Sequence, residues 1–577
     1  MNLDECCRAT TANSIALAAA FIAAACTAFC PLGAWAQRAP DAGAVLQQIE
    51  RGEAPPIAPS RPSPLQPSAP VALQSGGARV LVKQFHFEGN TRLSEAQLQK
   101  VVKAWLGKEL DFGELQRVAL AVAQAYREAG WVVRVDLPVQ DVTEGSIELR
   151  IQEAMLGAVN VVSAPIRSVS ASRAVATIEA QQQPGEPLSV ASLDRGLLLI
   201  NDLPGAAATA TLGAGSAIGQ TDVNVSLSQQ SLLSGSAYVD NSGEHATGSV
   251  EEGAHLTLNS PSGIGDQIAG DGLHTDGSNY GRLAYSIPVG YDGWRVGANA
   301  STLYYRLTAD EFKALDATGT ARSYGVEASY PLIRSTTRNL SLQLAFDDRQ
   351  FDNLAEATTV SNYTIYDASA SLSASIADTW LGGGFDSSVF QMTHGHFDRG
   401  DEPVRPDGSD QDFWRFRYSF SRWQGLTTRL SLFVALNGQF TNRNLDSSER
   451  FYLGGPSGVR AYPVNEAGGA QGTLLAAELR QSVWQSLTVA EFYDQGWITQ
   501  YHDDAMSLEG PLSGTAPNHY SLRGGGLTLS WAPVTRVHMY ATWAHRIGNN
   551  PNPSPTGTDQ DGTLLRNRFW LSASAGF

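Results

Sequence analysis

Residues 451–463, Phe-Tyr-Leu-Gly-Gly-Pro-Ser-Gly-Val-Arg-Ala-Tyr-Pro, are the most informative stretch of this 577-residue chain. It contains four residues that let a backbone turn back sharply: Gly454, Gly455, Pro456 and Gly458. An aliphatic residue, a guanidinium, a small residue and an aromatic follow: Val459, Arg460, Ala461 and Tyr462. This composition predicts a buried loop tip, and a buried charge needs a partner.

A candidate partner for Arg460 lies just over thirty residues further on. The segment Leu487-Thr-Val-Ala-Glu-Phe-Tyr-Asp494 has the character of a strand. Because side chains alternate along a strand, Phe492 and Asp494 lie on one face. The sequence therefore predicts that Asp494 forms an ion pair with Arg460.

Composition limits the classes of protein that this chain can be. The net charge is −17, from 40 Lys+Arg against 57 Asp+Glu. This balance argues against a nucleic-acid partner, which would require a basic surface. The 56 Gly, 12 Trp and 18 Tyr, with only 17% charged residues, favour a β-rich protein with many turns and aromatic girdles.

The N-terminus is expected to be a signal peptide, residues 1–36. An apolar run from Ile15 to Phe29 is followed by the small-x-small site Ala34-Trp-Ala36. A lipoprotein site at Cys26 is a weaker alternative. All four cysteines lie in the first 30 residues, so the mature chain is expected to have no disulfide and no thiolate active site. No later segment reaches about 18 apolar residues, so an integral membrane protein must here be a β-barrel.

Residues 37–53 contain a short helical pattern with Val45, Leu46 and Ile49 on one side. Residues 54–78 are rich in proline and are expected to form an extended linker. One interpretation is a disordered tail with a spacer. The other is a helix with a role inside the protein, held by a tether.

Two units of about 75 residues follow, at 79–153 and 154–229. The first has a strand, two helices with Ser94 and Asp111 as N-caps, and two further strands. The second repeats this β-α-α-β-β plan. Its Gly213-x-Gly215 pair lies between two strands and not before a helix, which excludes a dinucleotide-binding turn.

From 230 to 577 the sequence predicts strand after strand. About fifteen can be placed by alternation; Arg282–Ile287 follows His255–Asn259, and Thr379–Phe390 lies further on. Segments of about ten residues that alternate apolar and polar or small are typical of a transmembrane barrel. Two long polar segments, Arg399–Asp410 and Arg546–Gly562, are expected to be extracellular loops, and the tight links to be periplasmic turns.

The sequence gives no basis for catalysis. His394-Gly-His396 could in principle bind a metal, but a polar loop beyond a strand explains it better, as it does His502-Asp-Asp504. No Gly-x-Ser-x-Gly elbow and no Walker loop occur. We therefore predict no catalytic residue, no cofactor and no metal site.

These motifs together resemble the two-partner secretion transporters of the bacterial outer membrane, the TpsB family of the BamA-like superfamily. In that family the Arg of a Val-Arg-Gly-Tyr loop tip pairs with the Asp of a Phe-x-Asp motif on the barrel wall. Here Ala461 stands in place of the Gly. Trp131–Gly145 and Asn201–Gly205 resemble the two POTRA domains of the family.

The resemblance implies a mainly β fold: a 16-stranded antiparallel barrel after two α/β POTRA domains, with one strand missed above. It also implies that residues 37–53 plug the barrel. The expected function is export of a large exoprotein of adhesin, haemolysin or contact-dependent toxin type, recognised by its secretion domain. The expected surroundings are outer-membrane lipid and the barrel assembly machinery, with the protein a monomer and its POTRA domains in the periplasm. The alternative is an assembly factor of the same superfamily, which would carry more POTRA domains.

Overall fold

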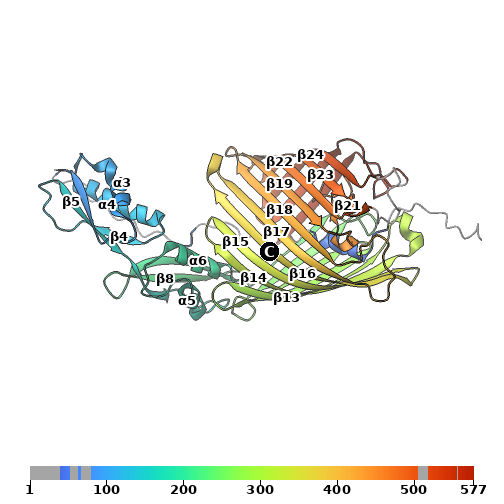
Figure 1. The fold of residues 1–577 in the computed structure, drawn as a ribbon, viewed down its shortest axis with the longest axis horizontal. Helices are drawn as coiled ribbons and strands as arrows, with labels where there is room; N and C mark the ends of the chain where they lie inside the picture. Colours follow the sequence, from blue (N-terminus) through green and yellow to red (C-terminus); the bar gives the residue numbers. More distant parts are fainter. Residues whose placement is uncertain (1–38, 52–62, 66–78, 505–516, 555) are drawn as a thin grey trace, which may run out of the picture.

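The computed structural model describes residues 39–51, 63–65, 79–504, 517–554 and 556–577. Two small α/β units extend from one end of a β-barrel (Figure 1). None of the helices in these ranges is long and apolar enough to span a bilayer. The predicted signal peptide and most of the predicted linker lie outside the described residues.

The first α/β unit has a three-stranded sheet in the order β2-β5-β4, covered by two helices. Asp111 caps the longer helix, where its side chain accepts a hydrogen bond from the N–H of Glu114. Ser94 and Gln97 form a capping box on the shorter one. The elements are β1 (Val80–Leu81), β2 (Gln84–Glu88), α3 (Glu95–Val102), η1 (Lys103–Trp105), β3 (Glu109–Leu110), α4 (Phe112–Glu128), β4 (Val133–Asp136) and β5 (Ser146–Glu153).

The second unit has the same topology, with a sheet in the order β6-β8-β7 and the first strand parallel to the last. The first helix of this unit begins at Ala171, because Ser170 supplies the N-cap. The elements are β6 (Met155–Val161), α5 (Ala171–Glu179), α6 (Val190–Asn201), β7 (Ala206–Ala214) and β8 (Gln220–Gln229). Each unit has its own buried hydrophobic core.

The remaining chain forms a closed antiparallel barrel of 16 strands. The strands are β9 (Leu233–Asp240), β10 (Glu251–Asn259), β11 (Gln267–His274), β12 (Ser278–Val289), β13 (Trp294–Arg306), β14 (Thr318–Arg334), β15 (Arg338–Ala355), β16 (Thr358–Asp378), β17 (Gly384–Asp398), β18 (Phe413–Gly425), β19 (Leu430–Thr441), β22 (Gln471–Trp484), β23 (Leu487–Thr499), β24 (His519–Val534), β25 (Val537–Arg546) and β26 (Asn567–Gly576). Short 3₁₀ turns, η2 (Asp310–Leu315) and η3 (Trp380–Gly382), lie between strands.

The expected total of 16 strands, with one missed, is confirmed, and the bounds of another strand were wrong. The missed strand is β11, whose outward positions include Gly270 and Gly272 and so give little alternation to detect. The segment placed at Thr379–Phe390 begins at Gly384 and continues to Asp398. His394 and His396 therefore belong to a strand and not to a loop beyond it.

The barrel closes between β26 and β9 through five paired positions, from Ser572 with Asp240 to Gly576 with Ser236. Asn241 extends this short ladder beyond the paired positions. Its side chain donates to the carbonyl of Phe569 at 2.9 Å and accepts from the N–H of Leu571 at 2.7 Å. A side chain thus supplies the hydrogen bonds that another strand residue would make.

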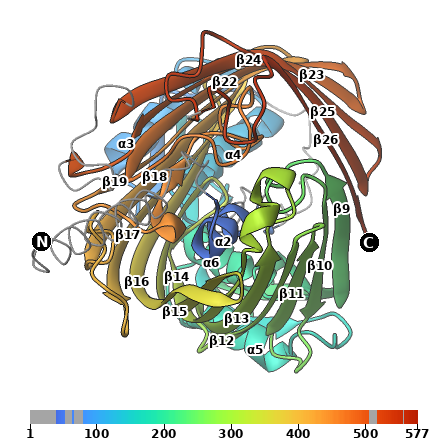
Figure 2. The same cartoon turned by 90° about the vertical axis from the view of Figure 1, so that its right-hand side faces the viewer.

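One helix lies inside the barrel, α2 (Ala42–Glu50), as the view along the barrel shows (Figure 2). Its N-cap is Asp41, which accepts from the N–H of Ala44 at 2.9 Å. Val45 and Leu46 are buried against an aromatic wall that includes Phe351 and Tyr363. The wall therefore covers the side of the helix that the sequence pattern marked as apolar.

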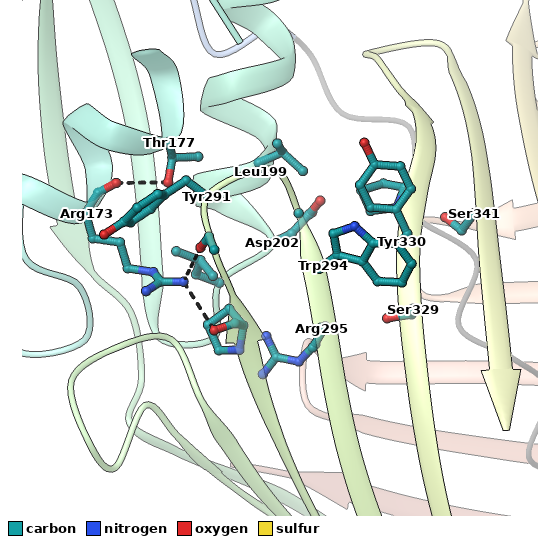
Figure 3. Close-up of a pocket in the computed structure, with 15 residues that line it drawn as sticks. Arg173, Thr177, Leu199, Asp202, Tyr291, Trp294, Arg295, Ser329, Tyr330 and Ser341 are labelled. Carbon is teal, nitrogen blue, oxygen red and sulfur yellow. Dashed lines mark hydrogen bonds between the residues drawn. The ribbon is translucent and has the colours of Figure 1, made fainter. Parts of the chain in front are cut away.

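The second α/β unit sits against the rim of the barrel (Figure 3). Arg334, buried in the rim, donates twice to the carboxylate of Asp202, both at 2.7 Å. Arg173 donates to the carbonyl of Gly290 at 2.9 Å. A pocket of about 170 Å³ remains between the two parts, lined by residues that include Tyr291 and Trp294.

Candidate functional site: a loop held inside the barrel

The connection between β19 and β22, residues 442–470, folds back into the barrel. It contains the 3₁₀ turn η4 (Ser447–Glu449) and a small hairpin of β20 (Phe451–Tyr452) and β21 (Gly468–Gly469). The tip of this lumen loop is residues 453–463. It is the segment that the sequence marked as buried.

Three glycines give the tip its shape. Gly455 has φ +98°, a left-handed conformation that suits glycine. A Cβ on Gly454 would lie 1.9 Å from the carbonyl oxygen of Pro463, and one on Gly458 would lie 1.8 Å from that of Leu453. No other residue fits at these two positions without a change of backbone, so the two limbs of the tip touch.

The apolar side chains that follow the turn of the tip are fully buried. Val459, Ala461 and Tyr462 are each 0% exposed and pack with Leu474, Phe492, Leu522 and Ala544 from the barrel wall. Burial of these apolar groups stabilises the loop in the lumen.

Arg460 contacts Asp494 on β23 through a two-pronged ion pair. Its Nε donates to Oδ2 at 2.9 Å and its Nη2 to Oδ1 at 2.7 Å. The backbone N–H of Arg460 also donates to Oδ2, at 3.1 Å. Asp494 is 0% exposed and Arg460 9%, so each charge is compensated by the other inside the protein.

Further groups complete the setting of Arg460. Its Nη1 donates to Glu478 on β22 at 2.7 Å, and its guanidinium lies over the ring of Phe492, 3.5 Å from the centroid. Trp570 on β26 donates from Nε1 to the carbonyl oxygen of Arg460 at 2.8 Å. The structure thus brings together Arg460, Phe492 and Asp494 as the sequence placed them, and adds Glu478 and Trp570.

A run of three glycines on β24 makes room for this contact. Gly524, Gly525 and Gly526 lie opposite Asp494, Tyr493 and Phe492 in the strand register. A Cβ on Gly524 would lie 2.6 Å from the Cβ of Ala461, and one on Gly526 would lie 2.8 Å from the ring of Phe492. Sequence reasoning missed this run, although three consecutive glycines in a strand are a signal of close approach.

The loop between β25 and β26 packs against the lumen loop. Asn550 donates to Glu466 at 2.8 Å, and the N–H of Gln560 does so at 2.8 Å. Burial raises the pKa of Glu466 to about 7. Arg546 lies over the ring of Tyr462, 4.3 Å from its centroid, and contacts Asp559. The lumen loop therefore lies between the barrel wall and the loop that joins β25 to β26.

The helix α2 holds the same loop from within the lumen. Gln47 donates to the carbonyl of Arg450 at 3.1 Å. Arg51, just past the helix, donates to the carbonyl of Tyr452, and Ser447 donates to Asp41 at 2.6 Å. The helix and the loop are thus parts of one packed unit.

The residues considered for metal binding do not form a site. His396 pairs with Asp412 at 2.8 Å, and His394 stacks edge-on against Trp414. Among the described residues, no group of three or more His, Cys, Asp or Glu side chains is placed to hold a metal ion.

Comparison with known families gives two matches. A family model described as haemolysin secretion/activation protein ShlB/FhaC/HecB matches residues 219–518, more than half of the chain. A model described as a POTRA domain of the ShlB type matches residues 80–154, the first α/β unit.

Curated relatives match most of the chain at low identity. The heme/hemopexin transporter protein HuxB of Haemophilus influenzae is 25% identical over 498 residues, 84% of each chain. The outer membrane transporter CdiB of Dickeya dadantii is 24% identical over 458 residues, 75% of this chain and 79% of CdiB.

Two solved structures share the fold. CdiB from Escherichia coli superimposes with a TM-score of 0.64 at 20% identity, covering 88% of this chain and 93% of CdiB. BamA from Haemophilus ducreyi lacking POTRA domains 1–3 gives a TM-score of 0.54 at 13% identity, covering 86% of this chain and 100% of that one.

Proposed function

This chain belongs to the ShlB/FhaC/HecB family of haemolysin secretion/activation proteins, and we propose that its lumen loop and α2 together hold the export channel closed between transport events. The protein is an outer-membrane transporter of the two-partner secretion type. It moves a partner exoprotein from the periplasm, where its POTRA domains lie, to the cell surface.

The observation that carries the proposal is the buried ion pair of Arg460 with Asp494. A pair of this kind is strong while both charges are present, and removing one partner costs about 3–5 kcal/mol because the other stays buried and uncompensated. The loop tip is thus fixed at one place on the wall. Export requires the tip and α2 to leave the path of the exoprotein.

The client is a large exoprotein with an N-terminal secretion domain, of adhesin, haemolysin or contact-dependent toxin type. The chain has no nucleotide-binding P-loop motif. The drive for export then comes from the client, through its stepwise folding outside the cell. The two POTRA domains take up the unfolded client by adding its strands to their sheet edges.

The remaining expectations about the protein's setting are part of the same proposal. The transporter has no catalytic activity and acts as a monomer, since one chain closes its own barrel and lumen. Outer-membrane lipid surrounds the apolar outer face, and the barrel assembly machinery inserts the protein.

The test is a double-mutant cycle on export. Arg460→Ala and Asp494→Ala should each reduce secretion of the client sharply, because a tip released from its place on the wall no longer moves between one closed and one open position and obstructs the lumen. The barrel should still insert and keep its heat-modifiable migration on gels. Because both changes remove one contact, the double variant should be little worse than either single variant. Arg460→Lys should also impair export, since an ammonium group cannot make the two-pronged contact.

Asp271→Ala is the matched control. Asp271 is a lumen-facing strand carboxylate that pairs with His255 at 2.5 Å. Its loss should leave secretion near the wild-type level. Fully additive losses at Arg460 and Asp494 would contradict the proposal that the two residues act together.

A further inference from the structure

Two arginines line the pocket between the second POTRA domain and the barrel rim: Arg173 from α5 and Arg295 from the rim end of β13 (Figure 3). Arg173 donates to the carbonyl of Gly290 at 2.9 Å, and Arg295 donates to the hydroxyl of Ser286 at 2.9 Å and to a backbone carbonyl at 3.0 Å. Among the described residues, neither guanidinium is hydrogen-bonded to a carboxylate. Their two positive charges also repel each other.

The carboxylates around this pocket do not compensate the two arginines. Asp202 lines the pocket, but its two oxygens accept from Arg334. Asp266 and Glu327 attract Arg295 only from a distance. Within the described part of the chain, the Nε of Arg173 is buried without a hydrogen-bond partner. The pocket therefore has an excess of positive charge and an unused donor.

The rim beside the pocket has the character of a membrane interface. It lies at the end of the barrel from which the POTRA domains extend (Figure 1). Trp294 stacks on Tyr330, with 4.8 Å between the ring centroids, and Arg173 lies over the ring of Tyr291, 5.4 Å from its centroid. Trp and Tyr side chains concentrate at the level of the lipid head groups. Large apolar side chains are exposed next to them: Val289, Leu332 and Ile333.

We propose that this pocket binds the phosphate of a phospholipid from the periplasmic leaflet, between Arg173 and Arg295, with the acyl chains along the exposed side chains of the rim. Arginine makes strong charge-assisted hydrogen bonds to phosphate, and basic pockets of membrane proteins bind lipid head groups. The pocket is smaller than the roughly 300–1,000 Å³ of a drug-sized ligand site, so it suits a small group whose chains lie outside.

The bound lipid connects two parts of the molecule. Arg173 belongs to the second POTRA domain and Arg295 to the barrel, so one phosphate between them replaces a repulsion by two attractions. The lipid thus holds the domain against the rim. Free phosphate offers the same anion without the chains.

Native mass spectrometry of the delipidated full-length protein in detergent tests the site, with dihexanoyl phosphatidylglycerol as the probe. The wild type should retain one lipid molecule per chain more tightly than any other. Arg173→Gln and Arg295→Gln should each weaken this retention by roughly tenfold or more, because each removes charge-assisted hydrogen bonds. Arg173→Lys keeps the charge and should bind more tightly than Arg173→Gln. Heat-modifiable migration on gels shows that each variant is folded.

Arg338→Gln is the matched control. Arg338 is an exposed arginine at the same rim, at the start of β15, and does not line the pocket. Its replacement should leave lipid retention at the wild-type level.

Two further probes separate the possible sources of the anion. Inorganic phosphate should bind at least roughly tenfold more weakly than the lipid, because it buries no CH₂ groups against the rim. Dihexanoylglycerol has the chains and no phosphate, and it should not compete for the site.

Three results would overturn the inference. The first is equal lipid retention by Arg173→Gln, Arg295→Gln and Arg338→Gln. The second is competition by dihexanoylglycerol as strong as that by the phospholipid, since the chains alone would then bind. The third is binding of inorganic phosphate as tight as that of the lipid, which would make the site one for a free anion. Secretion is not a readout in any of these measurements, so the proposed function is tested separately.

Discussion

The guanidinium of Arg460 makes contacts in three directions. Two N–H groups meet Asp494, one meets Glu478, and the face lies on the ring of Phe492. A planar group with donors in a fixed fork can make these contacts together, and a point charge cannot. Ala461 beside it is fully buried in contact range of Gly524, so the small side chain at this position is a packing requirement.

The shape of the tip predicts a second sensitive position, Gly458. In Gly458→Ala the new methyl would meet the carbonyl oxygen of Leu453, which forces the backbone of the tip to move. We expect secretion to fall nearly as far as in Arg460→Ala, with the barrel still heat-modifiable. In the control Gly272→Ala the methyl would have no neighbour closer than 4.0 Å, and secretion should be normal. Normal secretion by Gly458→Ala would show that the tip tolerates rearrangement.

Glu466 predicts a pH dependence of the closed loop. Its folded-state pKa of about 7 is above the usual 4.5, so the folded protein holds the proton more tightly than the unfolded chain. This contribution is complete below about pH 4.5 and is lost as the pH rises through 7. Amides in residues 442–470 should therefore exchange more slowly at pH 5.5 than at pH 8, after correction for the intrinsic rate. Glu466→Gln should flatten this difference, and an unchanged pH profile in that variant would exclude Glu466 as its source.

The sequence was sufficient for the Arg460 and Asp494 pair because each residue lies in a compact motif. The roles of Glu478 and Trp570 could not be predicted from the sequence, for a physical reason. Their positions next to Arg460 depend on the register between β22 and β23 and on the closure of the barrel by β26, which no local pattern records.

At the level of single elements, α2 is a nine-residue helix, too short to be stable alone in water. Its stability comes from the lumen: Ala42 donates to Asn353 at 2.8 Å, and Glu50 meets Arg349 at 3.5 Å. The sequence of this segment therefore permitted two interpretations, a disordered tail or a helix inside the protein. Its apolar side is too short to indicate whether other residues cover it.

Removing α2 should open the channel. We expect deletion of residues 39–51 to raise the single-channel conductance in planar bilayers, because the helix fills part of the lumen. An unchanged conductance would show that α2 does not limit ion flow.

Strands were predicted well where apolar and small residues alternate and poorly where they do not. β11 has glycine at outward positions, and β15 and β16 run well past their alternating centres, to 18 and 21 residues. Outside the bilayer a strand no longer needs an apolar outer face. The sequence pattern therefore marks the membrane-crossing part of such strands and leaves their ends undefined.

Across the whole molecule, the second POTRA domain and the barrel are joined by several specific contacts at the rim. Arg334 is buried in the barrel rim, and its carboxylate partner Asp202 belongs to the POTRA domain. This contact and that of Arg173 fix the orientation of the second POTRA domain against the rim of the barrel.

Loss of the ion pair between Asp202 and Arg334 should let the second POTRA domain move more relative to the barrel. Asp202→Ala leaves the guanidinium of Arg334 with Asn339, at the cost of charged hydrogen bonds of about 1.5–3 kcal/mol each before solvent screening. We expect a broader distribution of distances between fluorophores on POTRA 2 and the barrel. Asp136→Ala, which removes an exposed pair with Arg134, should leave the distribution as it is. An unchanged distribution for Asp202→Ala would mean that the other contacts suffice.

The contacts of α2 also set an order of events in folding. The hydrogen bond of Gln47 with Arg450 joins residues 403 positions apart, whereas Arg460 and Asp494 are 34 apart. Contacts of such high sequence separation form late, because most of the chain must be in place first. A helix that precedes the whole barrel in the chain is thus among the last elements to reach its native position. We propose that it can also leave and return while the barrel around it stays folded, as a reversible closure for a channel used many times would require.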